Sequence, residues 1–300
     1  MFYILGRVVA FSFVSLLLLL TMLSHAHADG FLMLETKLKY DSNLTHARFS
    51  QDQVGDMATV INATTGLYFQ MSDYNSLTIQ GEFGSELYNT YHGMNNLSLG
   101  GSATLKRKWG LGLYQPWTAL TLSLTHLDYN NDVRDGWLNK AMISGGKRVS
   151  EHWDIWADIS LQKRTQANEK VIEPGLSGSP FDLLNKVATL DAVYAFSENT
   201  FFMFGYQWRR GDVVASAITE SPIHAVFDPV TTAETTDNAF GVEGEAYRLK
   251  GTSHTFGAKI NTTINQHYVL GLEFQRYITH GGGGNNYYKS IPALTLSYNY

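Results

Sequence analysis

The sequence predicts an all-β protein, a transmembrane antiparallel β-barrel of about twelve strands preceded by a cleaved signal peptide. Three observations predict it: a secretory signal at the start, segments whose apolar residues alternate with a period of two, and short turns that alternate with long loops. The composition agrees with them. Charged residues make up 16% of the chain and aromatic residues 13%, whereas a soluble domain typically carries about 25% charged residues.

The first 28 residues have the pattern of a signal peptide. Arg7 provides the positive charge, residues 11–23 are almost continuously apolar, and Ala26-His27-Ala28 offers small residues for cleavage after Ala28. The apolar run is shorter than the roughly 20 residues that a membrane-spanning helix needs. We therefore expect a signal peptide at 1–28 and a single barrel domain at 29–300.

The rest of the chain alternates with the period of a β-strand. In residues 268–278, Leu270, Leu272 and Phe274 share one face, while the opposite face carries polar residues such as Glu273. A soluble sandwich of short strands would alternate in the same way. The expected strands are 31–41, 57–71, 76–89, 96–110, 116–128, 137–149, 153–164, 184–196, 200–210, 251–263, 268–279 and 287–300. Ten strands would also fit, and fourteen would require a hairpin inside 211–250.

The connections favour the membrane barrel over the sandwich. Short turns are expected at 72–75, 111–115, 150–152, 197–199 and 265–267, and longer loops at 42–56, 89–95, 129–136, 165–183, 211–250 and 280–286. Short periplasmic turns that alternate with longer outer loops are typical of outer-membrane barrels. Since the strand number is even, both termini are expected in the periplasm.

The chain ends on a strand that must close the barrel. Leu294, Leu296, Tyr298 and Tyr300 share one face of this strand, and we expect that face to contact lipid. An unpaired strand edge would leave backbone groups without partners in hydrocarbon. This apolar alternation with a terminal aromatic resembles the C-terminal signal of Gram-negative outer-membrane barrel proteins. The resemblance implies recognition by the barrel-assembly machinery and insertion into the outer membrane, in contact with its lipid and lipopolysaccharide.

Two further stretches resemble known barrel families. Tyr40-Asp41-Ser42-Asn43, at the end of the first strand, is similar to openings in the barrels of surface lipoprotein assembly modifiers and of exopolysaccharide-associated proteins. Residues 194–199 resemble the passage from strand to turn in the same barrels. Both resemblances imply the barrel fold.

The polar face of the strands predicts which side chains point into the barrel. The candidate lumen-facing residues are Glu35, Lys37, Lys39, Glu82, Glu86, Lys106, Lys108, Arg148, Asp158, Arg164, Asp191, Arg209, Lys259 and Glu273. Rings of charged side chains select solutes in aqueous pores. The same residues could instead pair across strands and fill a narrow interior; Lys259 and Glu273 lie at similar distances from the turn at 265–267 and could pair directly.

These observations predict a porin-like channel for small solutes. The alternative is a non-conducting surface barrel whose long loops 165–183 and 211–250 bind a partner or ligand. The latter loop is acidic, and we expect it to be solvated. No His lies near Ser in a motif typical of hydrolases, so we expect no enzyme; the alternative is an outer-membrane lipid hydrolase with Ser and His on the barrel wall. Without Cys or a calcium-loop motif we expect no metal or cofactor. The net charge of −5 argues against nucleic acid as a partner.

Overall fold

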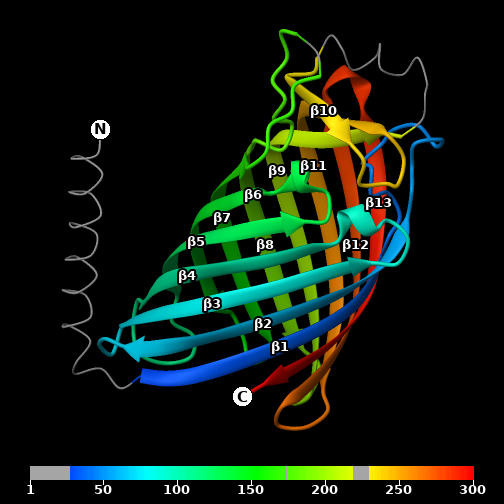
Figure 1. Ribbon diagram of the computed structural model, residues 1–300. Helices are drawn as coiled ribbons and strands as arrows, with labels where there is room; N and C mark the ends of the chain where they lie inside the picture. Colours follow the sequence, from blue (N-terminus) through cyan, green and yellow to red (C-terminus); the bar gives the residue numbers. More distant parts are fainter. Residues whose placement is uncertain (1–27, 173, 219–229) are drawn as a thin grey trace, which may run out of the picture.

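The computed structural model describes residues 28–172, 174–218 and 230–300, and its strands form one antiparallel sheet (Figure 1). Twelve strands form the barrel wall. They are β1 (Ala28–Asp41), β2 (Asp56–Gln70), β3 (Asn75–Tyr88), β4 (Asn96–Lys108), β5 (Trp117–Tyr129), β6 (Gly136–Arg148), β7 (Trp153–Gln166), β8 (Leu183–Ala195), β9 (Thr200–Ala217), β11 (Gly244–Thr263), β12 (Tyr268–Gly281) and β13 (Asn286–Asn299). The long loops contain the short 3-10 helices η2 (His92–Met94), η3 (Asp132–Arg134) and η4 (Gly282–Gly284).

The wall closes because its last strand pairs with its first. The β1–β13 pairing runs from Met33 opposite Asn299 to Lys39 opposite Ala293. Two backbone hydrogen bonds between Leu32 and Tyr300 extend it to the end of the chain. The predicted barrel of twelve wall strands is thus confirmed, and the soluble sandwich is ruled out because one sheet closes on itself.

A thirteenth strand, β10 (Ala233–Asp237), stands outside this ring. It pairs with the outer part of β11 and forms one parallel bridge with Ser177, while β9 and β11 pair directly with each other. Residues 211–250 therefore contain a strand, β10, but this strand is not part of the barrel wall, which keeps twelve strands.

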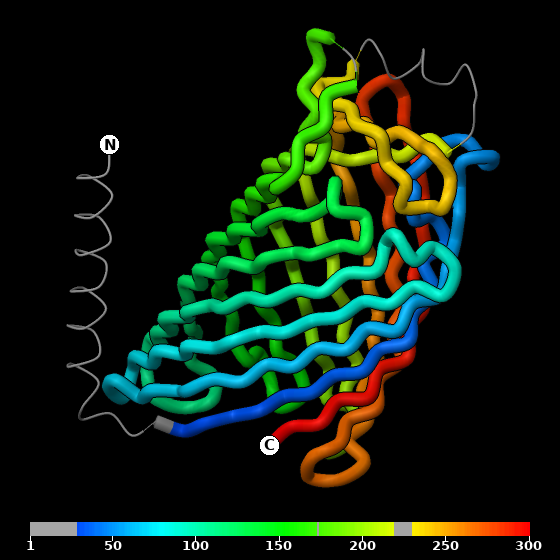
Figure 2. The backbone as a smooth tube through the Cα atoms, viewed as in Figure 1, coloured from blue at the N-terminus to red at the C-terminus, as the bar shows by residue number. Residues whose placement is uncertain are grey.

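The predicted strand ends agree with the structure within a few residues, except in β9 and β11. These two strands continue for seven residues beyond the expected limits of 210 and 251, and the end of β9 runs across the top of the barrel in the view of Figure 2. Ala215, Ala217, Tyr247 and Leu249 form a buried apolar cluster on this extension. Polar residues around Asp212 interrupt the alternation of apolar residues, so the sequence pattern did not predict that the strands continue.

The expectation of a solvated loop at 211–250 is wrong for its described part. Asp212 and Asp237 are both buried, at 3% and 0% exposure. Each carboxylate has a cationic partner, Lys250 for Asp212 and Arg134 for Asp237. Buried carboxylates require such partners because desolvation disfavours an isolated charge. Residues 219–229 lie outside the described part.

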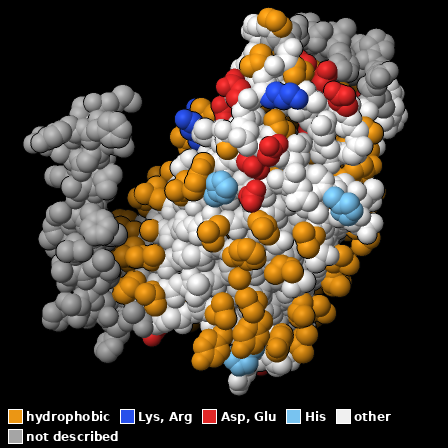
Figure 3. Space-filling model, in the orientation of Figure 1, with side chains coloured by type: hydrophobic (Ala, Val, Ile, Leu, Met, Phe, Trp, Pro, Cys, Tyr) orange, Lys and Arg blue, Asp and Glu red, His pale blue; other side chains and the backbone are white. Residues whose placement is uncertain are grey.

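The outward face of the wall is apolar. Ile155, Ile159 and Leu161 on β7 are exposed, whereas Asp158 and Ser160 between them are less so. Figure 3 shows exposed hydrophobic side chains gathered over the lower wall, with charged side chains near the long-loop end. This distribution matches the apolar band of a membrane barrel. Among the described residues, no helix is long and apolar enough to cross a membrane.

The start of β1 and the C-terminus lie at the same end of the barrel as the short turns (Figure 1). The long loops occupy the opposite end, which we call the outer end. The predicted signal peptide falls almost wholly in residues 1–27, outside the described part, and stays a prediction.

Removing the closing strand tests the role of the β1–β13 pairing. We expect that deletion of 286–300, and Tyr300→Asp alone, abolish folded barrel in outer-membrane fractions. The deletion leaves two edges unpaired, at several kcal/mol for each buried polar group. Tyr300→Phe keeps the aromatic end and should fold like the wild type. The measurement is the heat-modifiable gel shift of membrane fractions, and wild-type amounts of shifted Tyr300→Asp would contradict this role of Tyr300.

Candidate functional site: the barrel interior

Ion pairs that reach across an intervening strand define the inner face of the wall. Lys37 on β1 pairs with Glu273 on β12 at 3.1 Å, past β13. Lys39 pairs with Glu86 on β3 at 2.6 Å, past β2. Lys259 and Glu273 are direct neighbours in the ladder, as their turn spacing predicts. The structure nevertheless pairs the Glu273 carboxylate with Lys37.

Other predicted residues lie at mid-height on the same face. Glu35 accepts a hydrogen bond from Asn62 at 3.3 Å. Glu82 accepts one from Gln80 at 2.7 Å and another from Ser102 at 3.1 Å. Asp158 and Asp191 belong to the neighbouring strands β7 and β8.

The remaining predicted residues divide between the two ends of the barrel. Near the short turns, the Lys106 ammonium lies 4.3 Å from the Trp117 ring centroid, Lys108 is exposed, and Arg148 pairs with Asp154 at 3.0 Å. At the outer end, the Arg164 guanidinium lies over the rings of Tyr129 and Phe181. The Arg209 guanidinium donates to the Asp212 carbonyl at 3.3 Å.

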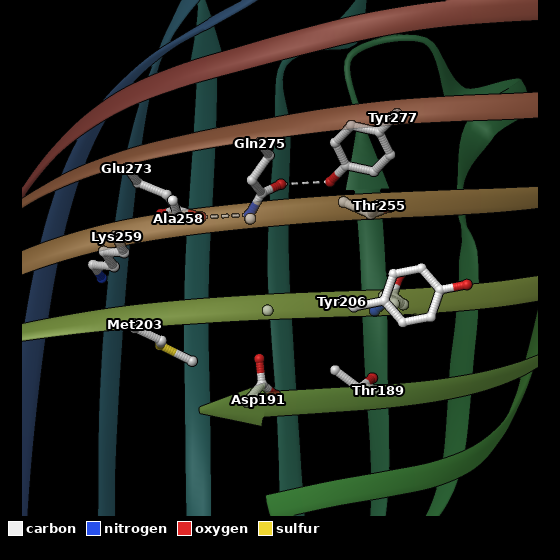
Figure 4. A pocket seen from close by; sticks show the side chains of 13 residues that line it. Thr189, Asp191, Met203, Tyr206, Thr255, Ala258, Lys259, Glu273, Gln275 and Tyr277 are labelled. Carbon is white, nitrogen blue, oxygen red and sulfur yellow. Dashed lines mark hydrogen bonds between the residues drawn. The ribbon is translucent and has the colours of Figure 1, made fainter. Parts of the chain in front are cut away.

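The inner face contains a hollow bounded by β8, β9, β11 and β12, with a volume of about 180 Å³. In Figure 4, Asp191, Lys259, Glu273 and Gln275 project around it. Gly205 and Gly257, direct neighbours in the ladder, leave its wall without side chains at that height. The side chains that line the hollow thus include acidic, basic and uncharged hydrogen-bonding groups.

Two more hollows continue this space around the wall. One, of about 190 Å³, lies between Lys37, Lys39 and Glu86, and shares Glu273, Gln275 and Tyr277 with the first. The other, of about 380 Å³, is lined by Glu35 and Glu82 and shares Asn62 with the second. The three hollows thus follow one another from β8 and β9 around to β5.

Packed loops cover the outer end of the barrel. We call residues 42–55, 92–94, 130–135, 177–182 and 231–243 the outer cap. Leu44, Met94 and Phe240 join the outer ends of β2 and β3 in one buried cluster, and Val133 and Phe181 join Ala246 of β11 in another. The loops meet closely, since a Cβ on Gly93 would lie only 2.5 Å from the Ala239 Cα.

A buried ion pair links η3 to β10 within the outer cap. The Arg134 guanidinium contacts both carboxylate oxygens of Asp237, at 3.1 and 2.5 Å, and lies over the rings of Phe181 and Phe240. Asn131 and Ser216 also donate to this carboxylate. Burial alone would raise the pKa of Asp237, but the charge and hydrogen bonds of Arg134 outweigh it and hold the pKa below its ordinary value.

A second polar cluster attaches the loop 42–55 to the wall. His46 stacks on Tyr287, its Nδ1 lies 3.1 Å from the Val214 carbonyl oxygen, and its Nε2 lies 3.2 Å from Lys289 Nζ. Lys289 also pairs with Asp41 at 2.8 Å. Burial and the positive charge of Lys289 lower the pKa of His46 to about 3, so its ring is neutral at neutral pH.

The sequence reasoning missed several of these residues. Lys140 and Lys289 have the same inward parity as the predicted set, so the alternation rule would have found both. Arg134 and His46 lie in the connections between wall strands, and Asp237 ends the five-residue strand β10. These segments are too short or too irregular for a periodicity to indicate which side chains are buried. Among the described residues, no group of three or more His, Asp or Glu could hold a metal ion.

Replacing Arg134 tests the ion pair of the outer cap. We expect Arg134→Leu to destabilise the cap locally by about 3–5 kcal/mol, because it leaves the buried Asp237 charge unpaired. Hydrogen exchange of residues 131–135 and 233–237 measures this effect. Arg148→Leu, which removes an exposed pair at the other end, is the control and should change these rates little. Equal exchange in Arg134→Leu and wild type would contradict a structural role for the pair.

The titration of His46 predicts a pH dependence of the loop 42–55. Its folded-state pKa is lower than the ordinary 6.5, so the closed loop loses stability as the pH falls from about 6.5 to about 3. The opened loop binds a proton that the closed loop does not. Opening should therefore become up to tenfold more favourable per pH unit, measured by limited proteolysis between pH 7 and pH 4.

His46→Asn provides the control for this experiment. The φ of residue 46 is +54°, and Asn tolerates this left-handed conformation. The variant should show a flatter pH profile in this window. Identical profiles for the two proteins would exclude His46 as the titrating group, leaving Asp41, Lys289 and Arg209, which face it, to be considered.

No protein-family model matches the chain, and no curated protein is similar to it in sequence. Among solved structures, it is similar to an outer-membrane channel from Pseudomonas putida F1, with a TM-score of 0.55 and 13% identity over 92% of this chain and 98% of that one. The NanC porin has a TM-score of 0.48, with 8% identity over 88% of this chain and 98% of the porin. The likeness to the Pseudomonas putida channel shows that the two chains share the antiparallel barrel fold.

Proposed function

We propose that the protein is a porin-like channel for small hydrophilic solutes in the bacterial outer membrane, with both termini in the periplasm. The observation that carries this proposal is the series of three hollows on the inner face, which share polar lining residues from one to the next. In this proposal, the fourteen inward residues predicted from the sequence line the solute path. The fold, shared with an outer-membrane channel, supports the location.

The lining favours polar solutes over apolar ones. Lys259, Asp191 and Glu273 border the first hollow together with Gln207 and Gln275. These side chains can donate and accept hydrogen bonds, and both signs of charge occur within one hollow. Since charged rings determine ion selectivity, a lining of mixed sign gives weak selectivity. Neutral or zwitterionic molecules rich in hydrogen-bonding groups fit this lining.

A second function is favoured by the packing of the outer cap. If the cap blocks the path, the protein is a non-conducting surface barrel whose loops 165–183 and 211–250 bind a partner. In both cases, we propose that outer-membrane lipid surrounds the wall and that the barrel-assembly machinery recognises the C-terminal strand. Neither case gives the barrel a catalytic role.

Single-channel recording distinguishes the two functions. The refolded mature protein is added to a planar bilayer with a salt gradient across it. Discrete conductance steps with a small reversal potential are expected for the channel. A silent bilayer, with folding verified by gel shift, would exclude the channel and leave the surface barrel.

A pair of glycine variants tests whether the first hollow belongs to the conducting path. Gly257 faces the hollow, and a Cβ there would meet nothing closer than 3.9 Å. Gly257→Phe should therefore fold and lower the conductance, because its ring occupies the path. Gly81 has the opposite parity on β3, and a Cβ there has open space within 4 Å. Gly81→Phe is the matched control and should conduct like the wild type; equal conductance in both variants would place the path elsewhere.

A further inference from the structure

Three cations stand close together on the outward face of the wall. Lys186 on β8 and Arg210 on β9 are direct ladder partners. Lys163 on β7 lies opposite Leu184, two residues from Lys186 along the same face. All three side chains are exposed and share the outward parity of the exposed Leu161 on β7, Leu190 on β8 and Phe204 on β9.

These three cations have no anionic partner among the residues that the structure describes. Asp212, two residues beyond Arg210 on the same face, is already engaged by Lys250 at 2.5 Å and by the Leu184 amide at 2.8 Å. Like charges that face each other directly across a ladder destabilise it. Lys186 and Arg210 therefore repel each other, and a bound anion would reduce this repulsion.

The cations lie at the outer edge of the apolar band. Lys186 and Arg210 are each eight residues from the rings of Tyr194 and Phe202, which are themselves ladder partners near the short turns. Eight tilted strand residues span about 20 Å of membrane thickness. That height corresponds to the headgroup region of the outer leaflet. Trp208, next to Arg210 on the same face, is a residue type that prefers this interface.

The cluster is confined to one side of the barrel. In the described wall, the outer halves of β1 to β6 and of β13 carry no outward Lys or Arg. Arg107 and Lys147 have outward parity but lie near the short turns, at the other end.

On β11, Lys250 pairs with Asp212. On β12, Arg276 lies over the Tyr288 ring and donates to Ser290. The cations on β7 to β9 therefore differ from these two in having no such partner among the described residues.

We propose that Lys163, Lys186 and Arg210 bind the phosphate of a phosphorylated lipid of the outer leaflet. Its acyl chains lie against the apolar wall below, at Leu190 and Phe204. Arg and Lys are the side chains that bind phosphate oxygens, Arg in a bidentate manner. Charge complementarity selects the phosphate, and the apolar surface directly beneath it selects a lipid over a free anion. This site does not depend on whether the barrel conducts.

The test compares lipid binding to the folded protein in detergent. Native mass spectrometry counts bound lipid A that carries both phosphates, and the same lipid without phosphates serves as the second probe. We expect Lys186→Gln/Arg210→Gln to bind phosphorylated lipid A at least about tenfold more weakly than the wild type. Arg107→Gln/Lys147→Gln removes the same charge at the other end and should bind like the wild type. The gel shift verifies that each variant is folded.

The outcomes decide both the site and the source of the phosphate. Equal binding by the wild type and Lys186→Gln/Arg210→Gln would overturn the site. Equal binding by the wild type of lipids with and without phosphates would show that only the apolar wall is recognised, which also overturns it. Displacement of phosphorylated lipid A by inorganic phosphate at the same concentration would show that a free anion suffices, and would overturn the assignment to lipid. A lack of channel activity would leave the proposal intact.

Discussion

The structure depends on the pairing of β1 with β13. A sheet in hydrocarbon has no water to satisfy an open edge, so the last strand must return to the first. This closure fixes the register around the ring, from Lys39 opposite Ala293 on one side to the β12–β13 ladder on the other. Because side chains alternate, one register then determines which residue faces lipid at every position of the wall.

The closed wall has a polar inner face and an apolar outer face. On β12, Glu273 and Gln275 border the inner hollows while Leu272 and Phe274 are exposed on the outside. Outward cations break the apolar pattern only toward the strand ends. Lys186 and Arg210 stand at such a height, where headgroups replace hydrocarbon and a cation is tolerated. The same parity that defines the lining of the inner hollows therefore also defines the surface presented to the membrane.

The wall could be predicted from sequence because its determinants are local. Alternation and turn spacing predicted most strand ends to within a few residues, and they placed Lys259 directly beside Glu273. The outer cap could not, because its contacts join distant segments: Arg134 and Asp237 are 103 residues apart, and His46 meets a carbonyl 168 residues away. The ion-pair partner of Glu273 could not be predicted for the same reason. Glu273 has two lysines within reach, and only the closed ring brings Lys37 closer.

The wall and the outer cap are held together by different forces. Lipid and ladder hydrogen bonds hold the wall, whereas the three buried apolar clusters found among the described residues lie at the outer end. The cap resembles a small soluble core, whose stability depends on packing and on the Arg134–Asp237 pair. The two parts nevertheless meet at the β1–β13 seam. The Ser42 amide of the cap donates to the Ser290 carbonyl of β13, and Lys289 of β13 pairs with Asp41 of β1 beside His46. Packing of the cap therefore also stabilises the outer end of the seam that closes the barrel.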